Sequence, residues 1–261
     1  MPLTIATWNV NSIKVRLPRL LDYLDARAPD VIVLQEIKCL DENFPRPEIE
    51  ERGYTIETHG QKTYNGVAIL SKHGLEDVSR GLPGDESDEQ ARYIEATIPA
   101  DRPVRVAGLY LPNGNPAPGE KFDYKLSWMK RLDARADELL ATEQAFVMLG
   151  DYNVIPDEDD VHDPKAWEGD ALFRPESRAA FRTLAHKGLT DAFRACTTRR
   201  HRYTFWDYQG GAWNKDHGIR IDHLMLSPEA ADRLEGAGID KYMRGEDKPS
   251  DHVPVWCQLA D

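Results

Sequence analysis

The chain has 261 residues, of which 41% are hydrophobic and 30% charged, and its formal net charge is −12. This composition is typical of a soluble globular protein, and the acidic charge argues mildly against a nucleic-acid partner, which usually needs a basic face. No segment approaches the ~18 apolar residues of a membrane span. The start, MPLTIATWNV, lacks a signal-peptide pattern, and three scattered cysteines indicate reduced thiols, so we expect a cytoplasmic protein.

The first predicted element is a strand that starts at Leu3 and brings Asn9 and Asn11 to its end. A helix is then predicted from about Ser12 to Ala28. Four leucines in it recur at i, i+3, i+4 and i+7, the spacing of one helix face: Leu17, Leu20, Leu21 and Leu24.

Polar side chains also end the next three predicted strands. The run from Val31 ends in Glu36, VRVAGLYLPNG carries Tyr110 and Asn113, and FVMLGDYN ends in Asp151 and Asn153. Because side chains alternate along a strand, Asp151 and Asn153 share one side of their strand. A carboxylate at the mouth of an apolar strand is costly unless it is paired or binds a cation.

Two later segments repeat the pattern. IRIDHLML buries Asp222 inside a strand, where an aspartate needs a buried partner. SDHVPVW places Asp251 and His252 immediately before a strand that begins near Val253. Polar turn formers at one strand end are ordinary, but this many together predict a functional site.

The remaining pattern predicts one domain spanning residues 1–261. Further helices are expected over about Glu120–Ala141 and Pro175–Lys187, among roughly ten strand-like segments. This favours two sheets covered by helices, an α/β or α+β sandwich. Each half has a similar plan, which indicates a pseudo-symmetric pair of sheets.

Charged runs have several interpretations. We expect a solvated loop for Asp157–Asp160 and a solvated helix face for Lys121, Lys125, Lys130 and Arg131. The basic run at residues 199–202 precedes aromatic residues at 203–208. It fits DNA contact and an ordinary turn beside core aromatics equally well.

The candidate site is rich in oxygen and has one imidazole and no thiolate. Its members are Asn9, Glu36, Tyr110, Asn113, Asp151, Asn153, Asp222, Asp251 and His252. Such ligands suit Mg²⁺ or Mn²⁺ better than Zn²⁺ and predict metal-assisted phosphodiester hydrolysis. The chain has no Walker-type phosphate loop and no GxSxG motif.

Seven segments carry a family resemblance: ATWNVNSIKVRL, DVIVLQEIKC, YNGVAILSK, LYLPNG, LGDYNV, RIDHLMLS and SDHVPV. In this order they closely resemble the bacterial exonuclease III group of abasic-site endonucleases, within the deoxyribonuclease I-like superfamily. The resemblance covers Leu3 to about Trp256 and implies a four-layered αββα sandwich of two mixed β-sheets flanked by helices.

The resemblance also implies roles for the residues that match the family's motifs. Glu36 would bind the metal, supported by Asn9 and Asp251, with Asp151 and Asn153 beside it. The residues with expected catalytic roles are Asp151, Tyr110, Asn153, Asp222 and His252. Asp151 would activate water or protonate the leaving group, and Asp222 would orient His252. Substrate-binding positions would be Asn11, Asn113, Phe205, Ile219, Ile221 and Arg92.

The implied function is a Mg²⁺-dependent DNA-repair phosphodiesterase, with Mn²⁺ as a possible substitute. It would act as a monomer on double-stranded DNA, cutting 5′ to abasic sites and removing 3′ blocking groups and 3′ nucleotides. Two alternatives stay open. The same chemistry would serve a small or lipid phosphodiester, and the fold would also serve a non-catalytic DNA-binding module.

Overall fold

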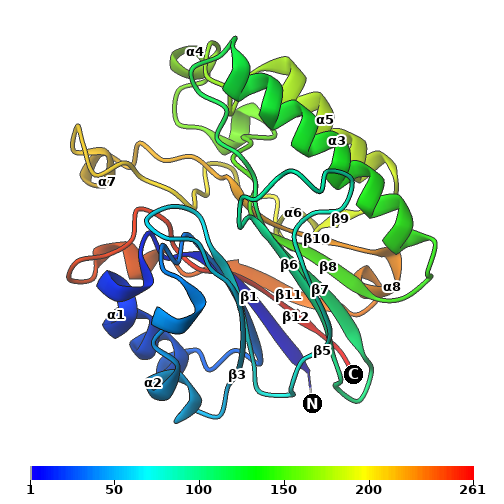
Figure 1. Cartoon of the computed structure of the whole chain (residues 1–261). Helices are drawn as coiled ribbons and strands as arrows, with labels where there is room; N and C mark the ends of the chain where they lie inside the picture. Colours follow the sequence, from blue (N-terminus) through cyan, green and yellow to red (C-terminus); the bar gives the residue numbers. More distant parts are fainter. Residues whose placement is uncertain (1) are drawn as a thin grey trace.

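The apolar runs pair into two six-stranded sheets that pack face to face in the computed structural model, which describes residues 2–261 (Figure 1). The strand order of the first sheet is β11 (Leu234–Ile239), β12 (Val255–Leu259), β1 (Leu3–Asn9), β2 (Val31–Gln35), β4 (Val67–Ser71) and β3 (Thr55–His59). The order of the second is β5 (Glu76–Arg80), β6 (Tyr93–Ile98), β7 (Val104–Tyr110), β8 (Phe146–Asp151), β10 (Asp222–Leu226) and β9 (Thr190–Asp191).

The two sheets share one pairing scheme. In each, the central pair is parallel, β1 with β2 and β7 with β8, and the described neighbours on either side pair antiparallel. The predicted pseudo-symmetry of the halves is therefore confirmed at the level of topology.

Inner strands such as β2, β4 and β8 are largely apolar because both of their faces are buried. In β1, Leu3 and Ile5 face the other sheet, whereas Ala6 and Trp8 pack under the first helix. The two sheets approach closely, since a Cβ at Gly108 would lie 2.4 Å from a methyl carbon of Val33. Burial on both faces removes the polar alternation of a half-exposed strand.

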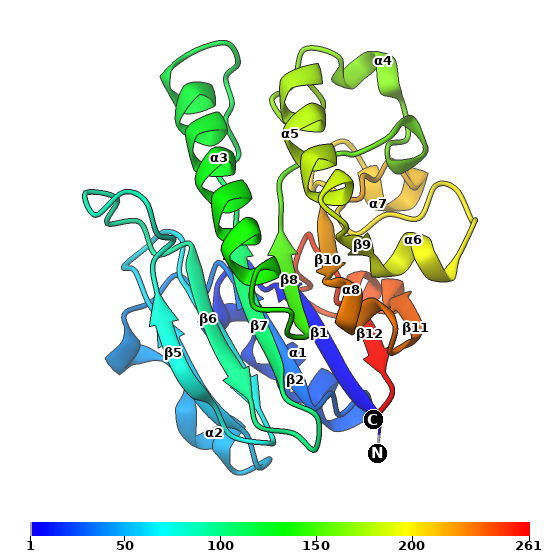
Figure 2. The same ribbon diagram turned by 90° about the vertical axis from the view of Figure 1, so that its right-hand side faces the viewer.

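Helices form the two outer layers (Figure 2). The first sheet is covered by α1 (Ile13–Ala26) and α2 (Arg46–Glu50), and the second by α3 (Glu120–Leu140) and α5 (Pro175–His186). The predicted four-layered α/β sandwich is confirmed. The short helices are α4 (Pro164–Trp167), α6 (Ala192–Cys196), α7 (Ala212–Lys215) and α8 (Pro228–Ala231), with 3₁₀ turns η1 (Asp41–Asn43), η2 (Glu158–Asp160) and η3 (Lys241–Gly245). Within residues 2–261, no helix has the length and apolarity to cross a membrane.

Strand direction gathers the polar strand ends at one place. The parallel strands β1, β2, β7 and β8 all end at the edge of the sandwich that lies away from the two chain termini (Figure 1). The antiparallel strands β10 and β12 begin at that same edge, and Asp222 pairs in register with Asp151. Two expected boundaries shift: Asp222 is the first residue of β10 instead of a mid-strand residue, and the last strand begins at Val255.

The prediction of a solvated loop over Asp157–Asp160 is wrong for its last residue. Asp160 is 1% exposed and accepts hydrogen bonds from Arg220 at 2.7 and 3.0 Å and another from Arg194. Burial raises the pKa of this carboxyl, but the two guanidinium groups outweigh burial and hold it below its usual value. Arg220 also donates a hydrogen bond to Asp191. This network of ion pairs therefore connects the loop after β8, which contains Asp160, to the segment just before β10, which contains Arg220.

We expect Asp160→Asn to lower the free energy of unfolding by about 3–5 kcal/mol at neutral pH, because it leaves the buried Arg220 under-compensated. A carboxyl with a depressed folded pKa stabilises above its unfolded pKa of about 3.9 and loses that contribution as pH falls. Urea denaturation should therefore show that the difference in unfolding free energy between wild type and variant becomes smaller below about pH 4. The exposed Glu158→Gln serves as control. If the difference in unfolding free energy between wild type and Asp160→Asn stays constant down to pH 3, the Asp160 carboxylate is not the source of this stability.

The prediction of a solvated helix face is wrong for Lys125. Its side chain is fully buried, and its ammonium donates to the backbone oxygens of Asn113 at 3.0 Å and Asn153 at 2.5 Å. Burial lowers the pKa of Lys125 to about 7, although Asp151 and Asp170 favour its charge. Lys125 lies on the same buried face of α3 as Phe122 and Met129. The sequence prediction missed this because it placed the lysine in solvent on the basis of its charge.

Candidate active site

The polar strand ends surround a cavity of about 210 Å³ between the two sheets. Most of the predicted site residues line it: Glu36, Tyr110, Asn113, Asp151, Asn153, Phe205, Ile219, Ile221, Asp251 and His252. The other four, Asn9, Asn11, Arg92 and Asp222, lie behind these residues and contact them through hydrogen bonds. The structure therefore brings these residues together at one edge of the sandwich.

Asp151 occupies the centre of the site. It continues the face of β8 that carries Val147 and Leu149 toward the other sheet, and it is 1% exposed. Its carboxylate accepts hydrogen bonds from the Asn153 backbone at 2.9 Å and the Asn9 amide at 3.0 Å. Burial raises its pKa to about 7, against the opposing charge of the nearby imidazole. Asp151 can therefore take or release a proton near neutral pH.

His252 lies between two aspartates. Its Nδ1 is 2.9 Å from one Asp222 oxygen and 3.1 Å from the other, and its Nε2 is 3.6 Å from Asp151. Burial disfavours the imidazolium, but Asp222 and then Asp151 outweigh it and raise the His252 pKa to about 10. The ring is therefore a cationic donor at neutral pH, with Nδ1 held by Asp222 and Nε2 directed toward the cavity side.

Glu36 forms the acidic corner of the first sheet. The Asn9 amide donates to one oxygen at 2.8 Å, and the Lys38 ammonium lies 2.7 Å from the other. Burial raises the pKa of Glu36, but these two hydrogen bonds outweigh burial and lower it. Lys38 also donates to Asn11 at 2.6 Å. Lys38 was not among the predicted residues, although its place two positions after Glu36 was a usable signal.

The second sheet supplies polar groups opposite this corner. Tyr110 ends β7, and the Arg92 guanidinium stacks 4.7 Å from its ring centre and donates to its carbonyl oxygen. Burial, Glu36 and Asp151 together raise the pKa of the Tyr110 phenol, which keeps it a donor. The Asn113 amide donates to Asn153 at 3.2 Å. Arg92 therefore contacts Tyr110 and does not line the cavity.

One side of the cavity is apolar. Phe205 forms one backbone β-bridge with Ile219 and a second with His252. The ring centres of Phe205 and His252 are 5.0 Å apart. Ile221 completes this wall. Trp167 and Leu172 also line the cavity and were not predicted. Trp167 ends the short helix α4 and Leu172 lies in the turn that follows, and these short segments carry no periodic pattern.

The basic-aromatic run at residues 199–208 divides into two parts. Tyr203 and Trp206 are buried in the core beneath the first sheet, as the ordinary interpretation expected. Arg199 and Arg200 are exposed, and Arg200 pairs with Asp159 at 3.1 Å. Of this run, Phe205 lines the cavity directly.

Two groups of donors could hold a cation here. Asp151, Asp222 and His252 offer donor atoms within 4.8 Å of one another. However, the Nδ1 of His252 is hydrogen-bonded to Asp222 and its pKa is raised, and a ligating histidine must be neutral, so this group suits a cation poorly. The oxygens of Glu36, Asn11 and Asp251 suit a hard cation better, and Glu36 and Asn11 already contact the Lys38 ammonium.

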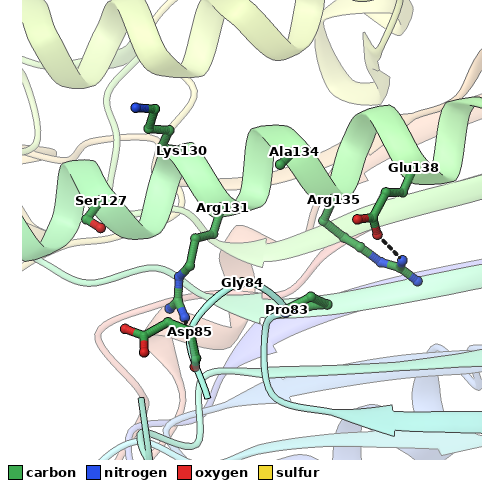
Figure 3. A pocket seen from close by; sticks show the side chains of 9 residues that line it. All are labelled: Pro83, Gly84, Asp85, Ser127, Lys130, Arg131, Ala134, Arg135 and Glu138. Atoms are coloured by element: carbon green, nitrogen blue, oxygen red, sulfur yellow. Dashed lines mark hydrogen bonds and ion pairs between the residues drawn. The ribbon is translucent and has the colours of Figure 1, made fainter. Parts of the chain in front are cut away.

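A separate surface cavity of about 290 Å³ lies between α3 and the loop at residues 83–85 (Figure 3). Both arginines that line this cavity form ion pairs with carboxylates. Arg131 pairs with Asp88, and Arg135 pairs with Glu138 and Glu95, both at 2.5 Å. This pairing is structural and gives the cavity no assigned role.

The fold, with carboxylates, amides and one imidazole at the strand ends, defines a phosphodiester hydrolase. The chain belongs to the endonuclease/exonuclease/phosphatase family, whose model matches residues 6–252. It is 33% identical to exodeoxyribonuclease III of Haemophilus influenzae, over 97% of this chain and 98% of that one. The resemblance to the exonuclease III group is thus confirmed, and nucleases of this family depend on a metal.

Two solved structures are also similar. An AP endonuclease from Archaeoglobus fulgidus has a TM-score of 0.93 and 35% identity, covering 98% of this chain and 99% of its own. A 3′ phosphatase from Neisseria, bound to a product DNA hairpin, has a TM-score of 0.94 and 38% identity, covering 99% and 100%.

Proposed function

We propose that this chain is a Mg²⁺-dependent DNA-repair phosphodiesterase. It cleaves 5′ to abasic sites and removes 3′ blocking groups and 3′ nucleotides from duplex DNA. The observation that carries the proposal is the buried set of Asp151, His252 and Asp222 beside an apolar wall. The similarity to an exodeoxyribonuclease, an AP endonuclease and a DNA-bound 3′ phosphatase supports it.

The residues divide the chemistry between them. Asp151 takes a proton from the attacking water or gives one to the leaving oxygen. His252 and Asn153 donate hydrogen bonds to the phosphoryl oxygens, where negative charge develops, and Asp222 holds the imidazole. Tyr110 and Asn113 contribute further donors, and the wall at Phe205, Ile219 and Ile221 receives the deoxyribose.

Mg²⁺, or Mn²⁺ in its place, would be held at Glu36, with support from Asn9, which hydrogen-bonds Glu36, and from Asp251, Asp151 and Asn153, which line the same cavity. When bound, the cation neutralises charge on the phosphate. The donors present fit this role because they are oxygens, and Glu36 remains ionised at neutral pH.

The proposed working form is a cytoplasmic monomer in which the whole chain is one catalytic domain. Both sheets contribute residues to the cavity, so neither half would act alone. A net charge of −12 opposes non-specific association with DNA. Binding should therefore use one face and weaken steeply as salt is raised.

The proposal is tested first on a duplex with a single 3′-phosphate at a gap. We expect Mg²⁺-dependent conversion to a 3′-hydroxyl end, detected as altered gel mobility and as extension by a polymerase. Folded protein that leaves the 3′-phosphate intact with Mg²⁺ present would contradict the proposal.

Glu36→Ala should raise the Mg²⁺ concentration that gives half-maximal cleavage by at least about ten-fold, because losing even an outer partner of a metal ligand costs 10–100-fold. Calorimetric Mg²⁺ titration gives a second readout that does not depend on turnover. The exposed Glu42→Ala is the matched control. An unchanged metal requirement for Glu36→Ala would remove this carboxylate from the metal site.

A further inference from the structure

A second cavity adjoins the candidate active site and shares a wall with it. Its volume is about 240 Å³, and four of its lining residues also line the catalytic cavity: Trp167, Phe205, Asp207 and Ile219. A ligand whose phosphate is held at His252 can therefore extend past Phe205 into this neighbouring space without leaving the protein surface.

Two parallel imidazole rings also line this second cavity. His162 and His217 stack with ring centres 4.6 Å apart and planes only 8° from parallel. The backbone fixes both residues, since His162 donates its N–H to the Gly218 oxygen at 3.1 Å and His217 donates to Ala212 at 2.9 Å. Gly218 itself fits tightly, because a Cβ there would lie 2.6 Å from Trp206.

The lining suits a flat, uncharged group. The walls combine the aromatic and imidazole rings with Ile219 and Ala212, and the polar groups are Asp207 and Gln209. Among the described residues that line it there is no lysine or arginine, so a second phosphate is poorly matched. A nucleobase has both a π-face for stacking and edge groups for Asp207 and Gln209.

We propose that this cavity is a subsite for the unpaired base of the 3′-terminal nucleotide, held while its phosphodiester lies at Asp151 and His252. The inference rests on the proposed function and names the substrate that uses this space. A 3′-phosphate end has no base to place there. The subsite therefore governs removal of 3′ nucleotides in particular and sets the balance between 3′ trimming and the other activities.

The test compares two duplex substrates, one ending in a 3′ nucleotide and one in a 3′-phosphate. In the double variant His162→Ala/His217→Ala, the ratio of KM for the nucleotide substrate to KM for the phosphate substrate should rise about ten-fold, the order expected from one lost stacking contact. His217→Phe, which keeps a flat ring, should restore most of the ratio. His186→Ala, an exposed histidine on α5, is the control.

A second measurement does not need turnover. A duplex ending in an unpaired 3′ 2-aminopurine on a flexible overhang, which is bright in free DNA, should lose fluorescence on binding the Asp151→Asn protein as the base stacks in the subsite. The signal should return when both histidines are also alanine.

The outcomes separate the two proposals. An unchanged KM ratio with the 3′-phosphate still removed would overturn the subsite and leave the proposed function standing. Equal losses on both substrates would make the two histidines merely structural and would also overturn the subsite. Wild-type protein that acts on neither end would overturn the proposed function and the subsite with it.

Discussion

Asp151→Asn is expected to lower the rate of phosphodiester cleavage by about 10²–10⁴-fold, the range that general acid–base catalysis contributes. The amide has almost the shape of the carboxyl and still accepts the Asn153 N–H. It cannot exchange a proton in the way that a carboxyl with a pKa near 7 can. Single-turnover cleavage of saturating duplex isolates this step from DNA binding.

The matched control for this change is Asp157→Asn, because Asp157 is exposed and lies outside the cavity. Circular dichroism and thermal unfolding should show that both variants fold. A folded Asp151→Asn protein with near wild-type turnover would show that Asp151 is not the acid–base group.

His252→Ala and Asp222→Asn should each reduce cleavage strongly, and together they should cost little more than the worse single change. The reason is that Asp222 acts through His252: its carboxylate holds Nδ1 at 2.9 Å and keeps the ring charged. Once the imidazole is gone, the aspartate has no ring to orient. The four proteins of this double-mutant cycle are compared by kcat/KM on one substrate.

Two losses that add on the free-energy scale would show that Asp222 and His252 act independently. His223→Ala is a useful comparison, since His223 is equally buried but faces Arg220 and the Val154 carbonyl instead of the cavity. Burial and Arg220 lower the pKa of His223 to about 4, so it does not share the cationic role.

Much of the fold could be predicted because burial on both faces leaves a strong signal. Strands such as β2 and β8 are continuous apolar runs, and the three long helices lie within two residues of the predicted bounds. The weakest signals come from the edge strands. β5 is mostly exposed and polar, β9 has two residues, and β11 contains two glycines.

The placement of the site followed from the strand ends, since parallel strands finish at one edge and their antiparallel neighbours start there. What the pattern could not show is partnership between distant charges. Asp160 is buried because Arg220 reaches it from 60 positions away, and Lys125 because two loop carbonyls accept from it. Charge alone favours solvent for both, and only the fold supplies the compensating partners.

The central claim is tested most directly on a labelled duplex carrying one abasic analogue, beside an undamaged duplex, each with Mg²⁺ and with chelator. The account predicts Mg²⁺-dependent incision 5′ to the lesion that leaves a 3′-hydroxyl, with little internal cutting of the undamaged strand. Folded protein that cuts neither duplex in Mg²⁺ would contradict it and would favour a small or lipid phosphodiester as the substrate of this cavity.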